Sequence, residues 1–398
     1  MFYHVIGLSY RKDLTYNQIS VVYGDAFVNI RGRPTRITLN NNPIHIIETN
    51  AFRQLDVTRL YLQDLKIDHL EYNTFEDVTA VEINLTKNKI KTLAAAVFTG
   101  TNYLQNLYLD NVGLKAVYGT LFKDASTVSG TISLEGNELN QLPGDFLSQV
   151  SPYEIKLTSN KISVFPKDMI QNTKVKRIDL NSNRIEVLPD DSFIGQGQLL
   201  EVMLKNNRIT DVHRGIFDPL KNVQTLDLSY NRLVYLAPGI FDAMDNLHSL
   251  YLSDNILFYF PAVNGTRLER LDLQRNTLTS IANDAFIYFN GTLKKIDLTD
   301  NSLNCDCQLY KTLVWVKKSI QGGNCSSPNA TSGLLFDHKE ENSTKYFAKP
   351  KGRVRGEMGI DYVSLNKLIH GLNLFSTVQG FRALGGVNES HAPNLACC

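Results

Sequence analysis

The segment Val223–Phe241, VQTLDLSYNRLVYLAPGIF, is the clearest copy of a pattern that recurs along most of this chain. Val223, Leu226 and Leu228 alternate with polar residues, which is the period of a half-buried strand. Apolar residues resume after Asn231 at a wider spacing that a strand cannot accommodate. The pattern therefore predicts a short strand, a turn and a return arm. One such unit has no opposing layer to cover its apolar face, so the copies must stack.

One position after each predicted strand is usually an asparagine. In a tight turn, its side chain offers an acceptor oxygen and two donor hydrogens to backbone groups that would otherwise be buried without partners. This rung position is occupied by Asn17, Asn42, Leu65, Asn88, Val112, Asn137, Asn160, Asn183, Asn207, Asn231, Asn255, Asn276 and Asn301. Leu65 and Val112 lack the amide, so we expect backbone pairing or water, and local irregularity, at those two turns.

The LxxLxLxxNxL spacing, at a mean period of about 24 residues, resembles the leucine-rich repeat. The resemblance implies an α/β fold: a curved leucine-rich-repeat solenoid, or horseshoe, with a parallel sheet on its concave face. We count thirteen repeats over residues 1–303, the first of them partial. The return arms also predict a buried spine of Phe27, Phe52, Phe75, Phe98, Phe122, Phe146, Phe193, Phe217, Phe241 and Phe286. The arm after Phe260 and Pro261 has no normal Phe position, and the sequence does not indicate how its packing is completed.

The chain enters the repeat pattern directly, with Leu14 and Asn17 already in register. Residues 1–20 carry no charged start, apolar core and small-residue cleavage site, so they do not form a signal peptide. An exposed solenoid end normally needs a capping unit. We therefore expect that the chain is a fragment lacking its natural start, or that a neighbouring subunit covers this end.

The repeat pattern ends in SLNCDCQLYKTLVWVKKSIQGGNCSSP, which starts at Ser302. The CDCQL motif, followed by apolar residues at helical spacing around Trp315, resembles the C-terminal cysteine cap of extracellular leucine-rich-repeat proteins. That group includes Slit, Toll-like receptors and variable lymphocyte receptors. The resemblance implies a cap over residues 304–347 whose helix covers the open end of the core. Residues 348–398 are then a linker and tail, for which docking on the cap and poor order are both open.

Caps of this group usually hold four cysteines in two bridges. Here none follows Cys325 until Cys397 and Cys398. Cys305 or Cys307 is expected to pair with Cys325, and the order usual in the family favours Cys305. The other cysteine is then free or bonded to the terminal pair. A zinc site and a prenylated C-terminus are competing interpretations, but no histidine stands at ligand spacing and the remaining sequence resembles a secreted protein.

The charge balance and the glycosylation motifs limit which cellular compartment and which class of partner are possible. The 41 Lys and Arg balance 40 Asp and Glu, which argues against nucleic-acid binding. No apolar run approaches the ~18 residues of a membrane helix, so membrane attachment requires a segment outside this chain. The glycosylation motif Asn-X-Ser/Thr occurs at Asn84, Asn264, Asn290, Asn324, Asn329, Asn342 and Asn388. Their density around the cap predicts an extracellular or cell-surface glycoprotein.

Strand alternation predicts one outward-facing residue between each pair of buried strand positions. Asn84 belongs to this column, and a glycan there would obstruct the neighbouring part of the face. We therefore favour a partner-binding surface formed by Lys156, Asp179, Met203, Asp227, Tyr230, Tyr251, Asp272 and Arg275. Tyr and Met supply contact area, and the charged residues supply a polar rim.

The sequence contains no hydrolase, metalloprotease, phosphate-loop or kinase motif, and it indicates no cofactor. We therefore expect a binding protein and not an enzyme. The first hypothesis is an extracellular recognition module for a protein or glycan, acting as a receptor ectodomain or secreted adhesion factor. Two alternatives stay open: the sensor fragment of a membrane signalling receptor or enzyme whose other parts are missing, and a structural matrix protein.

Overall fold

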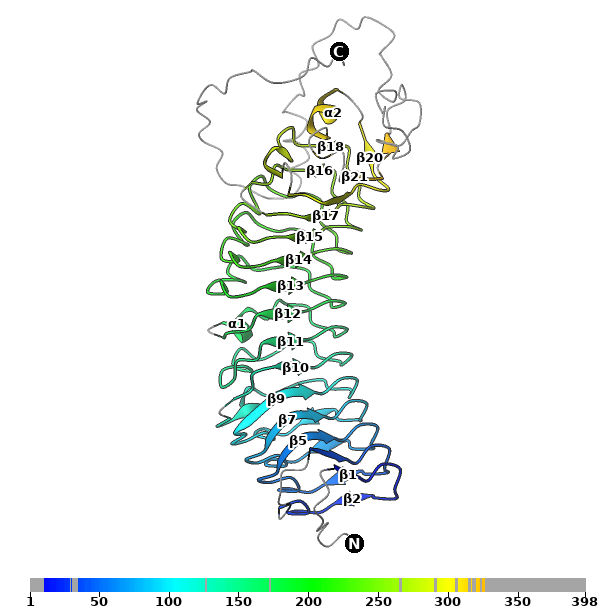
Figure 1. Ribbon diagram of the computed structural model, residues 1–398, viewed down its shortest axis with the longest axis vertical. Helices are drawn as coiled ribbons and strands as arrows, with labels where there is room; N and C mark the ends of the chain where they lie inside the picture. Colours follow the sequence, from blue (N-terminus) through cyan, green and yellow to red (C-terminus); the bar gives the residue numbers. More distant parts are fainter. Residues whose placement is uncertain are drawn as a thin grey trace, which may run out of the picture.

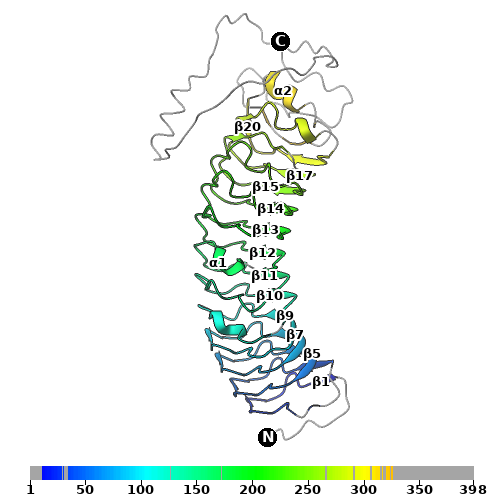
Figure 2. The ribbon, with the colours of Figure 1, turned by 90° about the vertical axis from the view of Figure 1, so that its left-hand side faces the viewer.

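The computed structural model describes residues 11–28, 30, 35–125, 127–171, 173–264, 267–289, 292–304, 307–313, 316, 320–322 and 324–325. Over this part, the chain winds into an elongated, curved solenoid (Figure 1). The main strands line its concave side, and the return arms form the outer side (Figure 2). The leucine-rich-repeat solenoid predicted from the sequence is confirmed.

A single parallel sheet of 14 strands runs the length of the solenoid. Its strands, in spatial order, are β1 (Arg11–Asp13), β3 (Arg36–Thr38), β5 (Asp56–Tyr61), β7 (Thr79–Asn84), β9 (Tyr103–Tyr108), β10 (Thr131–Ser133), β11 (Glu154–Lys156), β12 (Arg177–Asp179), β13 (Glu201–Met203), β14 (Thr225–Asp227), β15 (Ser249–Tyr251), β17 (Arg270–Asp272), β19 (Lys295–Asp297) and β21 (Ile320–Gln321). Equivalent residues of successive repeats pair in register, so each repeat position becomes a column along the solenoid.

The return arms hold short secondary elements. Four two-stranded parallel sheets join β2 (Val21–Val22) to β4 (Ile46–Ile47), β6 (His69–Leu70) to β8 (Thr92–Leu93), β16 (Tyr259–Phe260) to β18 (Ser280–Ile281), and β20 (Ser302–Leu303) to β22 (Asn324–Cys325). The helices of the described residues are η1 (Gly119–Phe122), α1 (Lys167–Ile170), η2 (Ile287–Phe289) and α2 (Cys307–Leu313). These arms are irregular, so the regular stacking of the repeats comes from the main sheet.

The rung asparagines form the predicted ladder. The buried Asn160 donates from Nδ2 to the carbonyl oxygens of Leu134 and Leu157, at 2.9 and 3.0 Å. Its Oδ1 accepts the N–H of Leu139 at 3.1 Å. The same pattern recurs at Asn183, where Nδ2 reaches Leu157 and Leu180. Each amide thus ties its own turn to the preceding repeat, which satisfies backbone groups that have no access to water.

The two rungs without an amide behave differently. Leu65 and Val112 occupy the same buried column as the asparagines. Beyond Leu65, the Oδ1 of Asn88 is buried and has no hydrogen-bond partner in the described structure. Beyond Val112, by contrast, the Oδ1 of Asn137 accepts the N–H of Val112 at 3.2 Å and two further backbone N–H groups. The irregularity expected from the sequence is therefore concentrated near Leu65.

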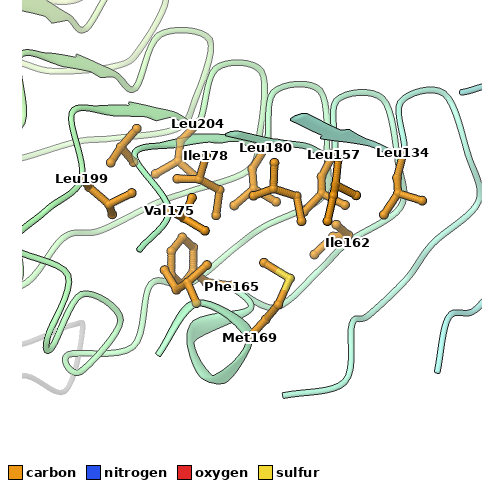
Figure 3. Packing of buried hydrophobic residues seen from close by; sticks show 14 of the residues in the cluster. Leu134, Leu157, Ile162, Phe165, Met169, Val175, Ile178, Leu180, Leu199 and Leu204 are labelled. Atoms are coloured by element: carbon orange, nitrogen blue, oxygen red, sulfur yellow. The ribbon is translucent and has the colours of Figure 1, made fainter. Parts of the chain in front are cut away.

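The phenylalanines of the return arms form the predicted spine, and all of them are buried. Most successive rings in contact stack, as in the pair Phe75 and Phe98, whose centroids lie 5.0 Å apart at an interplanar angle of 11°. The pairs Phe122–Phe146 and Phe193–Phe217 are tilted. Phe260 supplies the position that the sequence left open, since its ring lies 6.1 Å from that of Phe286. Figure 3 shows the opposing layer in the middle of the molecule, where leucines from successive repeats face Phe165 and Met169 of the return arm.

The C-terminal end of the core is covered by α2 and the residues after it. Leu309, Leu313 and Val316 are buried in the same apolar cluster as the repeats. The hydroxyl of Thr312 donates to the carbonyl oxygen of Asn283 at 3.2 Å, which fixes α2 against the last return arm. Strand β21 extends the sheet beyond the repeats, a feature that the sequence did not predict.

The predicted disulfide stays a prediction. In the small sheet of β20 and β22, the backbone of Cys325 pairs with Leu303. Cys305, Trp315 and residues 326–398, including Cys397 and Cys398, lie outside the described residues.

Candidate functional site

The in-register strands bring most of the predicted partner-binding residues into one row. Lys156 pairs with Asp179, which pairs with Met203. The row continues through β14 to Tyr251 and Asp272. These side chains therefore share the concave face on neighbouring strands, about 4.8 Å apart.

Asp227 does not fit the predicted exposed column, and that prediction is wrong for this residue. It is only 7% exposed, between Met203 and Tyr251 of the adjacent strands. Its Oδ1 accepts the N–H of Ser229 at 2.9 Å and the hydroxyl of Ser229 at 2.5 Å. Burial raises the pKa of the Asp227 carboxyl, although these bonds act in the opposite direction. Asp227 therefore supports the turn and offers little surface to a partner. Thr38 and Ser133 of the same column are also buried.

The other aspartates of the column have a similar structural role, which sequence reasoning missed. The Oδ1 atoms of Asp179 and Asp272 accept the backbone N–H two residues ahead, at 2.9 and 3.1 Å. Asp297 binds the N–H of Thr299 in the same way at 3.1 Å. A side-chain oxygen that accepts this N–H fixes the chain as it leaves the strand. Their half-exposed carboxylates line the concave face, but their position follows from turn geometry.

Tyr230 and Arg275 leave the sheet and enter a cluster at its edge. The Nη2 of Arg275 lies 3.2 Å from the phenol oxygen of Tyr230. The same guanidinium donates to both carboxylate oxygens of Asp254, with Nη2 2.8 Å from Oδ2. The ammonium of Lys205 lies over the Tyr230 ring, 5.0 Å from its centroid. We name these four residues, Lys205, Tyr230, Asp254 and Arg275, the edge cluster.

The edge cluster joins side chains from four successive repeats. Its bidentate pair with Asp254 raises the pKa of Arg275 further above its ordinary value. The Tyr230 side chain remains 42% exposed, and that of Arg275 43%. An arginine that is already oriented by a carboxylate and a phenol loses less rotamer freedom when it meets a ligand.

The backbone at this edge is unusual for the residues that it carries. The residue before each rung adopts a positive φ, which is 54° at Tyr230 and 49° at Arg275. Asn, Asp and Gly adopt this left-handed region more readily than other residues. Most equivalent positions carry Asn, Asp, Ser or Gly. Tyr230 and Arg275 are therefore held here against local preference, as are Tyr16 and Lys87 at the equivalent positions of two other repeats.

Four large apolar side chains lie exposed in the same repeats, and sequence reasoning missed them. Val234 and Tyr235 follow the rung of one repeat, and Ile256 and Phe258 follow the rung of the next; they are between 41% and 49% exposed. The Tyr235 and Phe258 rings stack with centroids 6.3 Å apart. We name these residues the apolar patch. The turn after the rung is usually polar in this chain. Apolar residues at these positions were therefore the sequence signal by which the patch could have been predicted.

The concave face of the N-terminal half is differently organised. Arg59 and Glu82 form an ion pair at 3.5 Å, and the guanidinium of Arg36 lies over the Tyr61 ring at 5.3 Å. Burial raises the pKa of both Tyr61 and Tyr108. Most charges here meet a partner on the next strand, so the face offers few groups oriented toward a ligand.

The predicted glycosylation sites fall into two groups. Asn84 ends β7 and is partly exposed, and its Oδ1 accepts the N–H of Thr86 at 3.1 Å. The backbone N–H of Asn264 donates to Asp242 at 3.0 Å. Asn324 lies in β22. The remaining sites, Asn290, Asn329, Asn342 and Asn388, lie outside the described residues.

The described part of the chain contains no cluster of three or more His, Cys, Asp or Glu with the geometry to hold a metal ion. Among the same residues, no helix combines the length and hydropathy needed to cross a bilayer.

Comparison with known proteins supports the repeat assignment. A model of the leucine rich repeat matches residues 197–257, and a model of the BspA type leucine rich repeat region, with 6 copies, matches residues 14–129. None of the curated proteins compared with this sequence matches it.

Solved structures of leucine-rich-repeat proteins share the fold. The structure of the Toll–Spatzle complex, from Drosophila, aligns with a TM-score of 0.58 at 20% sequence identity. That alignment covers 79% of this chain and 48% of the other, so the chain spans about half of that protein. A complex of Latrophilin 3, Unc5D and FLRT2 (LRR) aligns with a TM-score of 0.55 at 19% identity, covering 80% of this chain and 94% of the other. The repeats, the matched segments and the solenoid together show that this chain folds as a leucine-rich-repeat solenoid.

Proposed function

We propose that this chain is an extracellular recognition module that binds a protein partner at the concave edge formed by the edge cluster and the apolar patch. The observation that carries the proposal is the proximity of these two groups within adjacent repeats. Tyr230, Arg232 and Val234 follow one another around a single turn, so the edge cluster and the apolar patch lie on the same turn edge. Protein interfaces combine these features, with aromatic and arginine anchors beside a desolvated apolar centre.

The geometry favours a partner that presents both apolar and polar groups. The apolar patch offers contact area that gains free energy when it leaves water. The oriented guanidinium of Arg275 and the phenol of Tyr230 offer directional hydrogen bonds. Compared with the surface predicted from sequence, this site shifts toward the C-terminal repeats, because Asp227 is buried and the aspartate carboxylates serve their own turns.

Resemblance adds support to an extracellular role. Both similar structures are complexes, one of Toll with Spatzle and one of FLRT2 (LRR) with Latrophilin 3 and Unc5D. The predicted cysteine cap and the glycosylation motifs agree with passage through the secretory pathway. The proposed glycan at Asn84 lies on β7, whereas the edge cluster lies beyond β13. A glycan there would leave the proposed contact surface open.

Site-specific photo-crosslinking tests the proposal. A photoreactive phenylalanine analogue at Phe258 should capture one extracellular protein from conditioned medium, and unlabelled wild-type chain should compete in a saturable manner. The matched control carries the analogue at Tyr118, which is 51% exposed on a return arm. Equal capture at both positions, or capture without competition, would remove this edge as the binding surface.

A sensor fragment of a membrane receptor uses the same surface and therefore makes the same crosslinking prediction. What separates the two is the gene downstream of the codon for Cys398. A membrane span and a signalling domain in frame would favour the receptor fragment. A matrix protein, in contrast, predicts capture of several polymer components without saturation.

A further inference from the structure

A second surface of different character lies on the turn edge of the earlier repeats. We name it the basic ledge: the residues one and three positions after each rung, from the rung at Leu65 to that at Asn207. Its cations are Lys66, Lys89, Lys91, Lys115, Lys161, Arg184 and Arg208, and its acids are Asp68, Glu138 and Glu186. The whole chain has a formal net charge of +1, so positive charge is concentrated on this edge.

Backbone hydrogen bonds align these residues into files. The N–H groups of Lys161, Arg184 and Arg208 each donate at 2.8 Å to a carbonyl oxygen of the preceding repeat. The same bond forms at Lys66 and Lys89, at 2.8 and 2.9 Å. The side chains of one file therefore lie one above another, at the strand spacing of about 4.8 Å. The ledge presents charge at a regular interval along the solenoid.

The middle of the ledge is hollowed. An open hollow of ≈ 560 Å³ is lined by Lys115, Glu138, Asn140, Lys161, Ser163, Arg184, Glu186 and Arg208. Lys161 and Arg208 pair with Glu138 and Glu186, at 2.8 and 3.4 Å. In the part of the chain that the structure describes, no carboxylate lies within ion-pair distance of Lys115 or Arg184. Two cations of the hollow are thus available to an anion from solution.

The residues around the hollow identify the class of anion. Asn140 and Ser163 lie between the cations and offer neutral hydrogen bonds. The next column outward, at Thr92, Ala116, Gln141, Val164 and Val187, carries no charge that would repel an anion. Asp211 is the acidic exception at the C-terminal end of that column. No aromatic ring lines the hollow, so it lacks the stacking platforms with which proteins hold nucleobases.

We propose that the basic ledge binds a linear sulfated glycan, with its sulfates at Lys115 and Arg184 and its hydroxyl groups at Asn140 and Ser163. A linear polyanion matches a file of cations repeated along the solenoid better than a compact anion does. The surface differs from the edge cluster and apolar patch, so a glycan and a protein partner are able to bind at the same time. The proposal therefore stands apart from the proposed protein-binding function.

Binding to size-defined heparin fragments tests the proposal. The Lys115→Ala/Arg184→Ala variant should bind heparin about tenfold more weakly than the wild type, because it loses two surface ion pairs. The control Lys174→Ala/Lys221→Ala removes the same charge from exposed residues that precede strands, away from the rung turns, and should bind as the wild type does. Equal thermal unfolding midpoints establish that both variants are folded.

The outcomes separate a glycan site from a general charge effect. The selective loss in the ledge variant, with weak binding of poly-glutamate and of single-stranded DNA of equal charge, supports the proposal. No heparin binding by the wild type would overturn it. So would equal losses in the two variants, or poly-glutamate or DNA bound as tightly as heparin with the same dependence on Lys115 and Arg184.

Discussion

The guanidinium of Arg275 spans two repeats to reach Tyr230, with Nη2 3.2 Å from the phenol oxygen. The contact lies beside the carboxylate of Asp254, which holds the guanidinium through two bonds. Both residues occupy left-handed backbone positions that most other repeats fill with Asn, Asp, Ser or Gly, with Tyr16 and Lys87 as the exceptions. The edge cluster is thus an arrangement that the fold tolerates but does not require.

This strain predicts a conflict between stability and binding at Tyr230. Tyr230→Asn should stabilise the chain by about 1 kcal/mol, because asparagine adopts a positive φ at lower cost than tyrosine. The lost contacts with Lys205 and Arg275 are exposed and offset little of this gain. The same variant should weaken capture of the protein partner. Urea unfolding and the crosslinking yield measure the two effects, and a destabilised variant would contradict the account of strain.

The rung asparagines are predicted to stabilise the solenoid strongly. Asn160→Ala should cost about 3 kcal/mol, since it leaves the N–H of Leu139 buried without a partner. It also removes one of the two rung-asparagine bonds to each of the carbonyl oxygens of Leu134 and Leu157, which keep those from Asn137 and Asn183. Val112→Ala is the matched control at a rung that lacks an amide, and should cost only about 1 kcal/mol through lost packing. Unfolding midpoints in urea give the comparison. Equal costs would show that rung packing, and not the amide ladder, stabilises the turns.

Two phenylalanines of one repeat are predicted to respond differently to truncation. Phe260→Ala should destabilise the chain by about 3–5 kcal/mol, because the ring is fully buried and stacks on Phe286. Phe258 is two residues away but 41% exposed, and Phe258→Ala should change stability by about 0.5 kcal/mol or less. Thermal unfolding of the two variants measures the contrast. Similar losses would mean that Phe258 belongs to the core and not to the apolar patch.

The buried carboxyl of Asp227 should make the stability of the folded chain depend on pH. Burial raises the pKa of this carboxyl in the folded chain above its ordinary value of 3.8. Deprotonation therefore opposes folding at neutral pH, and this penalty disappears as pH falls through the folded pKa toward 3.8. Asp227→Asn should raise the unfolding midpoint at pH 7, and the gain should shrink as the pH is lowered.

The control for Asp227 is Asp272→Asn, because Asp272 makes the equivalent turn bond and is only partly buried. This variant should show a smaller gain at pH 7. A gain for Asp227→Asn that is independent of pH would refute the role of the buried carboxylate.

The sequence predicted the elements that repeat. Each rung such as Asn160 recurs at a period fixed by the turn, so its column and bonds follow from spacing alone. The spine follows for the same reason, whereas Phe260 escaped prediction because its arm is shorter than the others. Strand β21 was not predicted either, because it belongs to the cap and does not follow the repeat pattern.

The candidate site was harder to predict, because it depends on contacts between repeats. Alternation correctly placed Asp227 between Met203 and Tyr251 in the concave column, but it carried no information on the bonds from Ser229 that hold its carboxylate in the turn. The bond between Arg275 and Tyr230 depends on side-chain direction at two turns. No periodic pattern encodes that direction.

The affinity of the captured partner for an edge-cluster variant tests the central claim most directly. The dissociation constant should rise at least about tenfold for Tyr230→Ala/Arg275→Ala, because aromatic and arginine anchors dominate such interfaces. The control Tyr72→Ala/Lys221→Ala, which removes one tyrosine and one positive charge at exposed positions elsewhere, should match the wild type. An unchanged dissociation constant for the Tyr230 and Arg275 variant would contradict the claim that this edge is the binding surface.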